Sequence, residues 1–190
     1  MAERADAARN RERVLAAAAT VFAGRESRSV TMGEIAAAAG VGRATLYRRY
    51  PDIAAVATAL LDQHERDLQE QLMRGAPPLG PGAPPVERMA AFYAAMVDLL
   101  DKHVHLVLGS ETGRLRFETG AYGFWRAHVR SLLVAATTPD PDALVEPLLA
   151  PLAPDVFLYQ RRDRRLSTRR IVASLTRLAH AALVHENCER

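Results

Sequence analysis

The segment TMGEIAAAAGVGRATLYRRY, residues 31–50, restricts the possible folds more than any other part of the chain. Thr31 and Glu34 have the spacing of a capping box, in which each side chain accepts a hydrogen bond from the other residue's backbone N–H. Gly40 can adopt the left-handed conformation that ends a helix. The segment therefore predicts a helix over 32–39 that ends at a tight Gly-Val-Gly turn.

A second short helix is expected to follow this turn, from Arg43 to Tyr50, because Pro51 disfavours helical geometry in the residue before it. Two helices of about two turns joined by Gly-Val-Gly form a helix-turn-helix arrangement. Leu46 and Tyr50 are four residues apart and are expected to pack inward. The remaining side chains then face outward, namely Arg43, Ala44, Thr45, Tyr47, Arg48 and Arg49. In such motifs the second helix meets base edges, while hydroxyls and cations hold phosphates, so this surface predicts a DNA contact.

The rest of the chain has the signature of an all-α protein. The period-2 alternation of strands is almost missing, whereas apolar residues recur at helical spacing. With 49% hydrophobic and 25% charged residues, the composition is that of a soluble globular protein. The longest apolar stretch, residues 14–23, is too short for a membrane span, and Cys188 is the only cysteine. We therefore expect a cytoplasmic protein that has no membrane partner, no disulfide and no cysteine-based zinc site.

The positive charge is concentrated at one end of the chain. Residues 1–52 contain nine arginines against six acidic residues, whereas basic and acidic residues balance over 53–190. This asymmetry favours an amino-terminal part that meets an anion. A solvated basic face in an arginine-rich chain would give the same count.

Further helices follow from the apolar periodicity, and one segment interrupts them. Residues 75–85 hold five prolines and three glycines and are expected to form a surface loop. Prolines at 147, 151 and 154 predict a break near 151–154. The expected helices cover residues 10–23, 53–73, 86–104, 118–136 and 168–185, the last capped by Ser167.

Residues 14–52 resemble the amino-terminal DNA-binding domain of the tetracycline-repressor (TetR) family of bacterial transcriptional regulators. The resemblance rests on Phe22, Thr31, the Ala-Gly-Val turn at 39–41, the Thr-Leu-Tyr sequence at 45–47, and Tyr50. It implies a helix-turn-helix domain over 1–52 and a helical domain for effector binding and dimerisation over 53–190.

The resemblance also implies roles for single residues. Thr31 is expected near a phosphate, and Thr45 and Tyr47 are expected to give their hydroxyls to the DNA backbone. Arg43 and Ala44 occupy positions that touch bases, Arg48 can contact a base or a phosphate, and Arg49 a phosphate. One departure is Ile53, which stands where a phosphate-binding lysine is common in the family. A second departure is Gly33, which cannot reach a base, so base reading is expected from the second helix of the motif alone.

The carboxyl-terminal part has two expected binding regions. By their residue types alone, a group of large side chains forms either ordinary core or a cavity for an apolar or aromatic molecule, and the resemblance favours the cavity. The group consists of Phe92, Met96, Leu106, Tyr122, Trp125 and Val129. The resemblance also implies a homodimer interface at the last helices, for which the stripe on the final helix gives Ile171, Leu175, Leu178 and Ala182.

These features predict a repressor that binds a palindromic double-stranded operator as a homodimer and is released by a small apolar or aromatic molecule. No cofactor or metal is expected, because His103 and His105 in a His-x-His spacing cannot share one helical face. An enzyme is not expected either, since no nucleophile elbow, phosphate loop or metalloprotease motif is present in the sequence. Two alternatives stay open, a helical ligand-binding protein and a DNA-binding regulator that has no small-molecule response.

Overall fold

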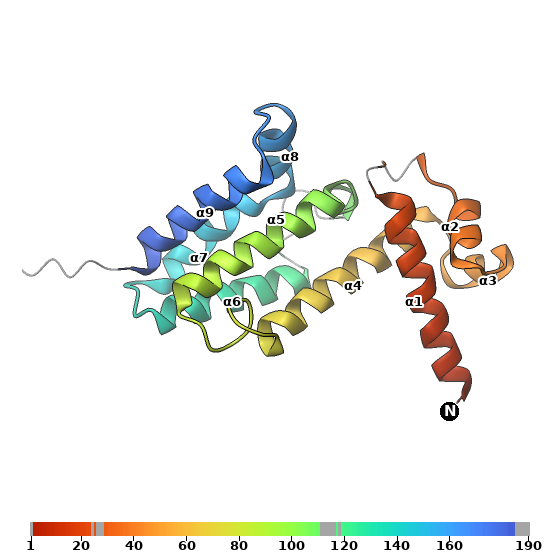
Figure 1. Cartoon of the computed structure of the whole chain (residues 1–190), viewed down its shortest axis with the longest axis horizontal. Coiled ribbons are helices and arrows are strands. Elements are labelled where there is room, and N and C mark those ends of the chain that lie inside the picture. Colours follow the sequence, from red (N-terminus) through yellow and green to blue (C-terminus); the bar gives the residue numbers. More distant parts are fainter. Residues whose placement is uncertain (1, 24, 26–28, 111–116, 118, 185–190) are drawn as a thin grey trace, which may run out of the picture. The chain divides into compact units, whose positions relative to one another are not determined.

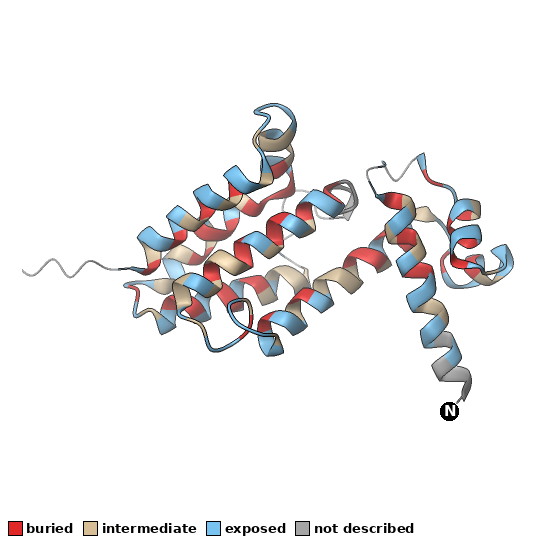
Figure 2. Cartoon of the chain, viewed as in Figure 1, coloured by how far each residue is buried: buried red, intermediate tan, exposed pale blue. Residues whose placement is uncertain are grey.

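The computed structural model describes residues 2–23, 25, 29–110, 117 and 119–184, and Figure 1 shows the helices that they form. Throughout these ranges the regular structure is helical and contains no strand, which confirms the predicted all-α fold. The chain divides into two compact units, Met1–His64 and Glu65–Arg190. Each unit has its own buried residues (Figure 2).

The amino-terminal unit consists of α1 (Ala2–Phe22), α2 (Met32–Ala39), α3 (Arg43–Arg49) and the first part of α4 (Ile53–Arg74). Helix α1 begins eight residues before the predicted Asn10. The apolar stripe that predicted this helix starts only at Val14, whereas the preceding turns are rich in alanine, arginine and glutamate, which favour helices without an apolar face. An ion pair between Arg9 and Asp6, three residues apart, supports these first turns.

The carboxyl-terminal unit packs a bundle around α5 (Pro85–Ser110), which contacts α6 (Gly120–Ala135), α8 (Pro154–Arg162) and α9 (Thr168–Leu183). Helix α7 (Pro141–Leu149) packs on α6 and continues into a short 3₁₀ segment, η3 (Ala150–Leu152). The predicted break near 151–154 is confirmed, since η3 ends at Leu152 and α8 begins at Pro154. The prolines at 151 and 154 have no backbone N–H, so a continuous helix would lose two hydrogen bonds there. The predicted loop over 75–85 separates α4 from α5.

The core of this unit is formed mainly by the inward faces of α5, α6, α7 and α9. Phe92 and Tyr93 of α5 are fully buried. The Tyr93 hydroxyl donates a hydrogen bond of 2.9 Å to the backbone carbonyl of Leu148, which joins α5 to α7. Burial raises the pKa of the Tyr93 phenol, so the group stays protonated and keeps this donor.

Helix α4 belongs to both compact units, which divide between His64 and Glu65. The functional division between residues 52 and 53, at the start of α4, stays a prediction. At the other end of the chain, Ser167 caps α9 as predicted, accepting a hydrogen bond of 3.3 Å from the Arg170 backbone N–H. None of the helices in the described ranges is long and apolar enough to cross a membrane.

Candidate nucleic-acid interface

The start of α2 is fixed by the predicted capping box. The Glu34 backbone N–H donates to Thr31 Oγ1 at 3.2 Å, and the Thr31 backbone N–H donates to Glu34 Oε2 at 2.7 Å. Arg25 adds an ion pair of 3.0 Å to the second carboxylate oxygen. The hydrogen bonds from the Thr31 hydroxyl and backbone, with a smaller contribution from Arg25, lower the pKa of Glu34 and keep it ionised.

The end of α2 is held by a left-handed glycine and by an arginine from α1. Gly40 has φ 62° and ψ 39°, and its N–H and that of Val41 return to carbonyls of the last turn. Arg13 Nη2 donates to the carbonyl oxygens of Ala39 and Gly40, at 2.7 and 3.3 Å. A cation at a helix carboxyl terminus satisfies carbonyls that have no partner within the helix and complements the helix dipole. The direction of α1 is therefore tied to the turn that orients α3.

Helix α3 presents most of its side chains to solvent. Leu46 and Tyr50 are buried at 2% and 6% exposure, which confirms the predicted inward face. Thr45 is half-buried, and the other outward residues are exposed, namely Arg43, Ala44, Tyr47, Arg48 and Arg49. Thr31 at the start of α2 is exposed as well. The structure therefore brings all seven predicted DNA-contacting residues onto the surface of one unit.

The arginines of α3 have no counter-ions of their own. Among the described residues, Arg43, Arg48 and Arg49 make no hydrogen bond and no ion pair. Three cations on one seven-residue helix repel one another unless an anion approaches. Their donors are thus available to a polyanion.

A cationic groove, which was not predicted, runs between α1 and α3. Its volume is about 680 Å³, and its charged lining consists of Asp6, Arg9, Arg11, Arg13, Arg48 and Arg49. Two buried polar atoms at this groove, Arg11 Nε and Tyr50 Oη, have no partner in the described chain. Both can donate to an oxyanion. The early turns of α1 form one wall of the groove. These turns carry no apolar stripe, so their sequence does not indicate that they lie beside α3.

The predicted effector-binding side chains are divided between the core and a small cavity. Phe92 and Val129 are fully buried, and the side chain of Leu106 lies outside the described residues. Met96, Tyr122 and Trp125 line a cavity of about 60 Å³. Its other walls come from α4, α5, the end of α7, η3 and the start of α8, namely Glu65, Leu99, Leu100, Leu149, Ala150, Leu152, Ala153 and Pro154. These residues were not predicted, because only the folded chain brings the segment 149–154 onto the faces of α5 and α6.

A second, wider cleft of about 400 Å³ shares Tyr122 and Ala150 with this cavity. The Tyr122 hydroxyl donates to the Glu146 carboxylate, which also pairs with Arg126. The Tyr122 ring is packed edge-on against Phe117, with ring centroids 5.0 Å apart. Tyr122 thus contributes to both spaces, with an apolar ring contact and a charged acceptor for its hydroxyl.

The four residues assigned to a dimer interface do not share one surface. Ile171 and Leu175 are 2% and 3% exposed and pack in the core of their own chain, and Ala182 is half-buried against that core. Leu178 is 51% exposed. The outer face of α9 combines Leu178 with small and basic residues, namely Arg170, Ala173, Ser174, Arg177 and Ala181. The predicted stripe on α9 combined residues of two faces, because apolar residues occur on the outer side of this helix as well as on the side that faces the core.

Two short helices at a glycine turn, with unpaired arginines on the outer face of the second, are the features of a helix-turn-helix DNA-binding regulator. The comparisons with known proteins agree. Residues 14–60 match the family described as bacterial regulatory proteins, tetR family. Over 62 residues the chain is 42% identical to an HTH-type transcriptional regulator of Mycobacterium tuberculosis that is itself uncharacterised, an alignment that covers 33% of this chain and 31% of the relative. The chain thus matches only about a third of the length of that curated relative.

Solved structures resemble the whole fold. FadR from Bacillus subtilis, in complex with stearoyl-CoA, superposes with a TM-score of 0.65 at 15% identity and covers 92% of this chain and 99% of its own. A TetR transcriptional regulator from Streptomyces coelicolor gives a TM-score of 0.61 at 24% identity, with 89% and 97% covered. The sequence of residues 14–60 is therefore similar to that of TetR-family transcriptional regulators, and the fold of the chain is shared with solved structures of such regulators. The matched family and the curated relative are transcriptional regulators and not enzymes, in agreement with the sequence prediction.

Proposed function

We propose that this chain is a ligand-responsive repressor that binds a palindromic DNA operator as a homodimer. The observation that carries the proposal is the outward face of α3, on which three arginines lack partners within the described chain. In this arrangement the start of α3 enters the major groove. There the Arg43 guanidinium can pair with guanine O6 and N7, and the Ala44 methyl can meet a thymine methyl.

Phosphate binding is assigned to the groups around that helix. The hydroxyls of Thr31, Thr45 and Tyr47 donate to the DNA backbone, and Arg48 and Arg49 supply charge. The cationic groove beside α1 supports this assignment, since its net charge is positive and its two unpartnered buried atoms can both act as donors.

The homodimer is proposed to form at α8 and α9. Its support is the exposed apolar and small surface on these helices, where Val156, Tyr159 and Leu178 are exposed and Ala173 and Ser174 allow close approach. A two-fold dimer places two copies of α3 in successive major grooves, about 34 Å or a multiple of it apart. Ile171 and Leu175 act indirectly, by fixing α9 on its own core.

The effector is proposed to be an apolar or aromatic molecule that enters beside Tyr122. A cavity of about 60 Å³ is smaller than the several hundred Å³ that a drug-sized ligand needs, so binding requires the Tyr122 ring to move and join the cavity to the neighbouring cleft. A helix that belongs to both units, α4, gives the ligand a route to α3. Near-complete release requires the ligand to prefer the released state by about 10⁴-fold.

The proposal is tested by selecting genomic DNA fragments on the purified protein and then titrating the recovered sequence at several salt concentrations. We expect a two-fold symmetric site and binding by a species with twice the mass of the chain. Apolar and aromatic compounds are then screened for release of that DNA. Trp125 is the only tryptophan and lines the cavity, so its fluorescence reports direct binding. Fragments without a shared sequence would overturn the regulator, and a shared site that no compound releases would favour a regulator without an effector.

Replacing Arg49 by alanine is expected to weaken binding to all DNA sequences alike, because an exposed arginine on a phosphate contributes charge and no base information. The slope of log affinity against log salt should become shallower by about one. Replacing Arg43 by alanine is expected to relax specificity at one base position in each half-site. Equal behaviour of the two variants in a fluorescence anisotropy titration would refute the division between base reading and phosphate binding.

A further inference from the structure

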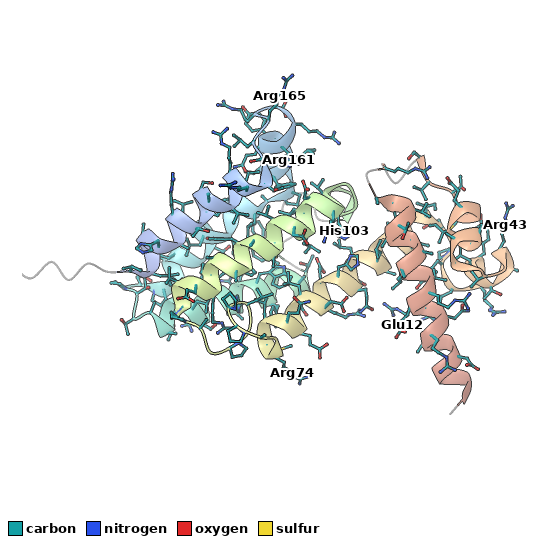
Figure 3. The ribbon with its side chains drawn as sticks, in the orientation of Figure 1. Glu12, Arg43, Arg74, His103, Arg161 and Arg165 are labelled. Atoms are coloured by element: carbon teal, nitrogen blue, oxygen red, sulfur yellow. The ribbon has the colours of Figure 1, made fainter. Side chains whose placement is uncertain are left out.

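The first turn of α2 has a gap opposite the first residue of α3. Gly33 carries no side chain, and the Arg43 guanidinium lies across it. A Cβ atom added at Gly33 would stand 2.9 Å from Arg43 Nη2, 3.3 Å from Cζ and 3.4 Å from Nε. Ordinary contacts of a Cβ atom begin at about 3.4 Å, so the guanidinium occupies the space that any larger residue at this position would fill. Figure 3 labels Arg43 in this unit.

The guanidinium rests in this gap without being bound there. Within the described part of the chain, Arg43 makes no hydrogen bond or ion pair. Glu34, the neighbouring carboxylate, already accepts from the Thr31 backbone and hydroxyl and from Arg25. All five N–H donors of Arg43 therefore stay free, while the gap restricts the direction in which its long side chain extends.

We propose that Gly33 is a specificity-determining position, because its missing side chain seats the Arg43 guanidinium in the orientation from which it reads a guanine. The inference rests on the proposed function, since it concerns how the same helix pair recognises DNA. Gly33 touches no base itself. It acts by positioning Arg43, and a bidentate contact with guanine requires both the place and the plane of the guanidinium to be correct.

A larger residue at Gly33 is expected to leave the fold intact. The only atoms that the added Cβ meets closely belong to the far end of a flexible side chain, which can swing away. Gly33 lies within α2 and is not among the residues with positive φ, and glycine is a poor helix former. Replacing it by alanine should raise the melting temperature of the amino-terminal unit by roughly 2–8 °C while it displaces Arg43.

The test compares Gly33→Ala, Gly33→Leu and Arg43→Ala by sequence selection on randomised operator DNA, followed by competition titrations. The wild type is expected to prefer guanine at one position of each half-site by about 5- to 150-fold, the range of a good bidentate arginine contact. Gly33→Ala should reduce this guanine preference roughly threefold or more. Gly33→Leu should reduce it to the level that Arg43→Ala shows, or below that level. Preferences at the other positions and the salt slope should remain those of the wild type.

Two controls make the outcome decisive. Ala38→Leu adds a side chain at an exposed site of α2 about 140° around the helix from Gly33, and should leave the guanine preference unchanged. Gly33→Leu is also combined with Arg43→Ala, where it should have no further effect on base preference. An unchanged guanine preference in Gly33→Leu would overturn the proposal, and so would a new base preference that persists without Arg43. A wild-type protein that selects no sequence would instead refute the proposed function.

Discussion

Replacing Leu46 by alanine is expected to destabilise the amino-terminal unit by about 2–5 kcal/mol and to abolish specific operator binding. Leu46 is the most deeply buried residue of α3, at 2% exposure. A helix of seven residues is too short to persist in water without tertiary packing, so the positions of the outward arginines depend on this side chain. The loss would be a large part of the stability of a small domain.

The measurement for Leu46→Ala is urea denaturation followed by far-UV circular dichroism, because Trp125 lies in the other unit and reports that unit only. Met73→Ala is the control for truncating an exposed side chain, since it removes a similar volume from a residue of the other unit that is 51% exposed, and it should change the free energy of unfolding by less than about 0.5 kcal/mol. A Leu46→Ala protein that keeps its operator affinity at ordinary temperature would contradict the assigned role of Leu46.

Acidification is expected to destabilise the carboxyl-terminal unit through His128. Burial, with a smaller contribution from the Arg88 cation, lowers the pKa of His128 from 6.5 to about 4. The ring lies in the core, with its centroid 5.2 Å from that of Phe92. Between pH 6.5 and 4 the unfolded chain binds the proton and the folded chain does not. Stability contributed by the neutral ring is therefore complete above pH 6.5 and falls by about 3 kcal/mol as the pH approaches 4.

This loss is measured by urea denaturation at pH 7.5 and pH 4.0, followed by Trp125 fluorescence. His128→Leu is the comparison, because leucine fills a similar volume and binds no proton. Other titrating groups contribute equally to both proteins, so the difference between the two pH dependences isolates His128. We expect the wild type to lose about 3 kcal/mol more than the variant. Parallel pH dependences would show that His128 does not stay neutral in the folded chain.

The helix-turn-helix was predictable because its signals are local. The capping box at Thr31, the left-handed Gly40 and the inward pair of Leu46 and Tyr50 each lie within a few residues of their partners, and each is confirmed. The break near 151–154 was predictable for the same reason, since prolines act on the turn that contains them.

Features that depend on tertiary contacts could not be predicted in this way. Arg13 reaches carbonyls 26 and 27 residues away, and nothing in a helical stripe indicates such a contact. The amphipathic pattern of α9 likewise does not distinguish a face that meets its own core from one that meets a second copy. Ile171 and Leu175 proved to be core residues, whereas Leu178 on the same helix is exposed.

The contact between Arg13 and α2 has a consequence for how the operator preference of this chain can be changed. Its acceptors are main-chain oxygens, which every amino acid provides. Side chains on the outer surfaces of α2 and α3 can thus be exchanged while the hydrogen bonds from Arg13 of α1 keep their acceptors. A library of variants at Gly33, Arg43 and Ala44 could therefore be searched for new DNA targets on an unchanged scaffold.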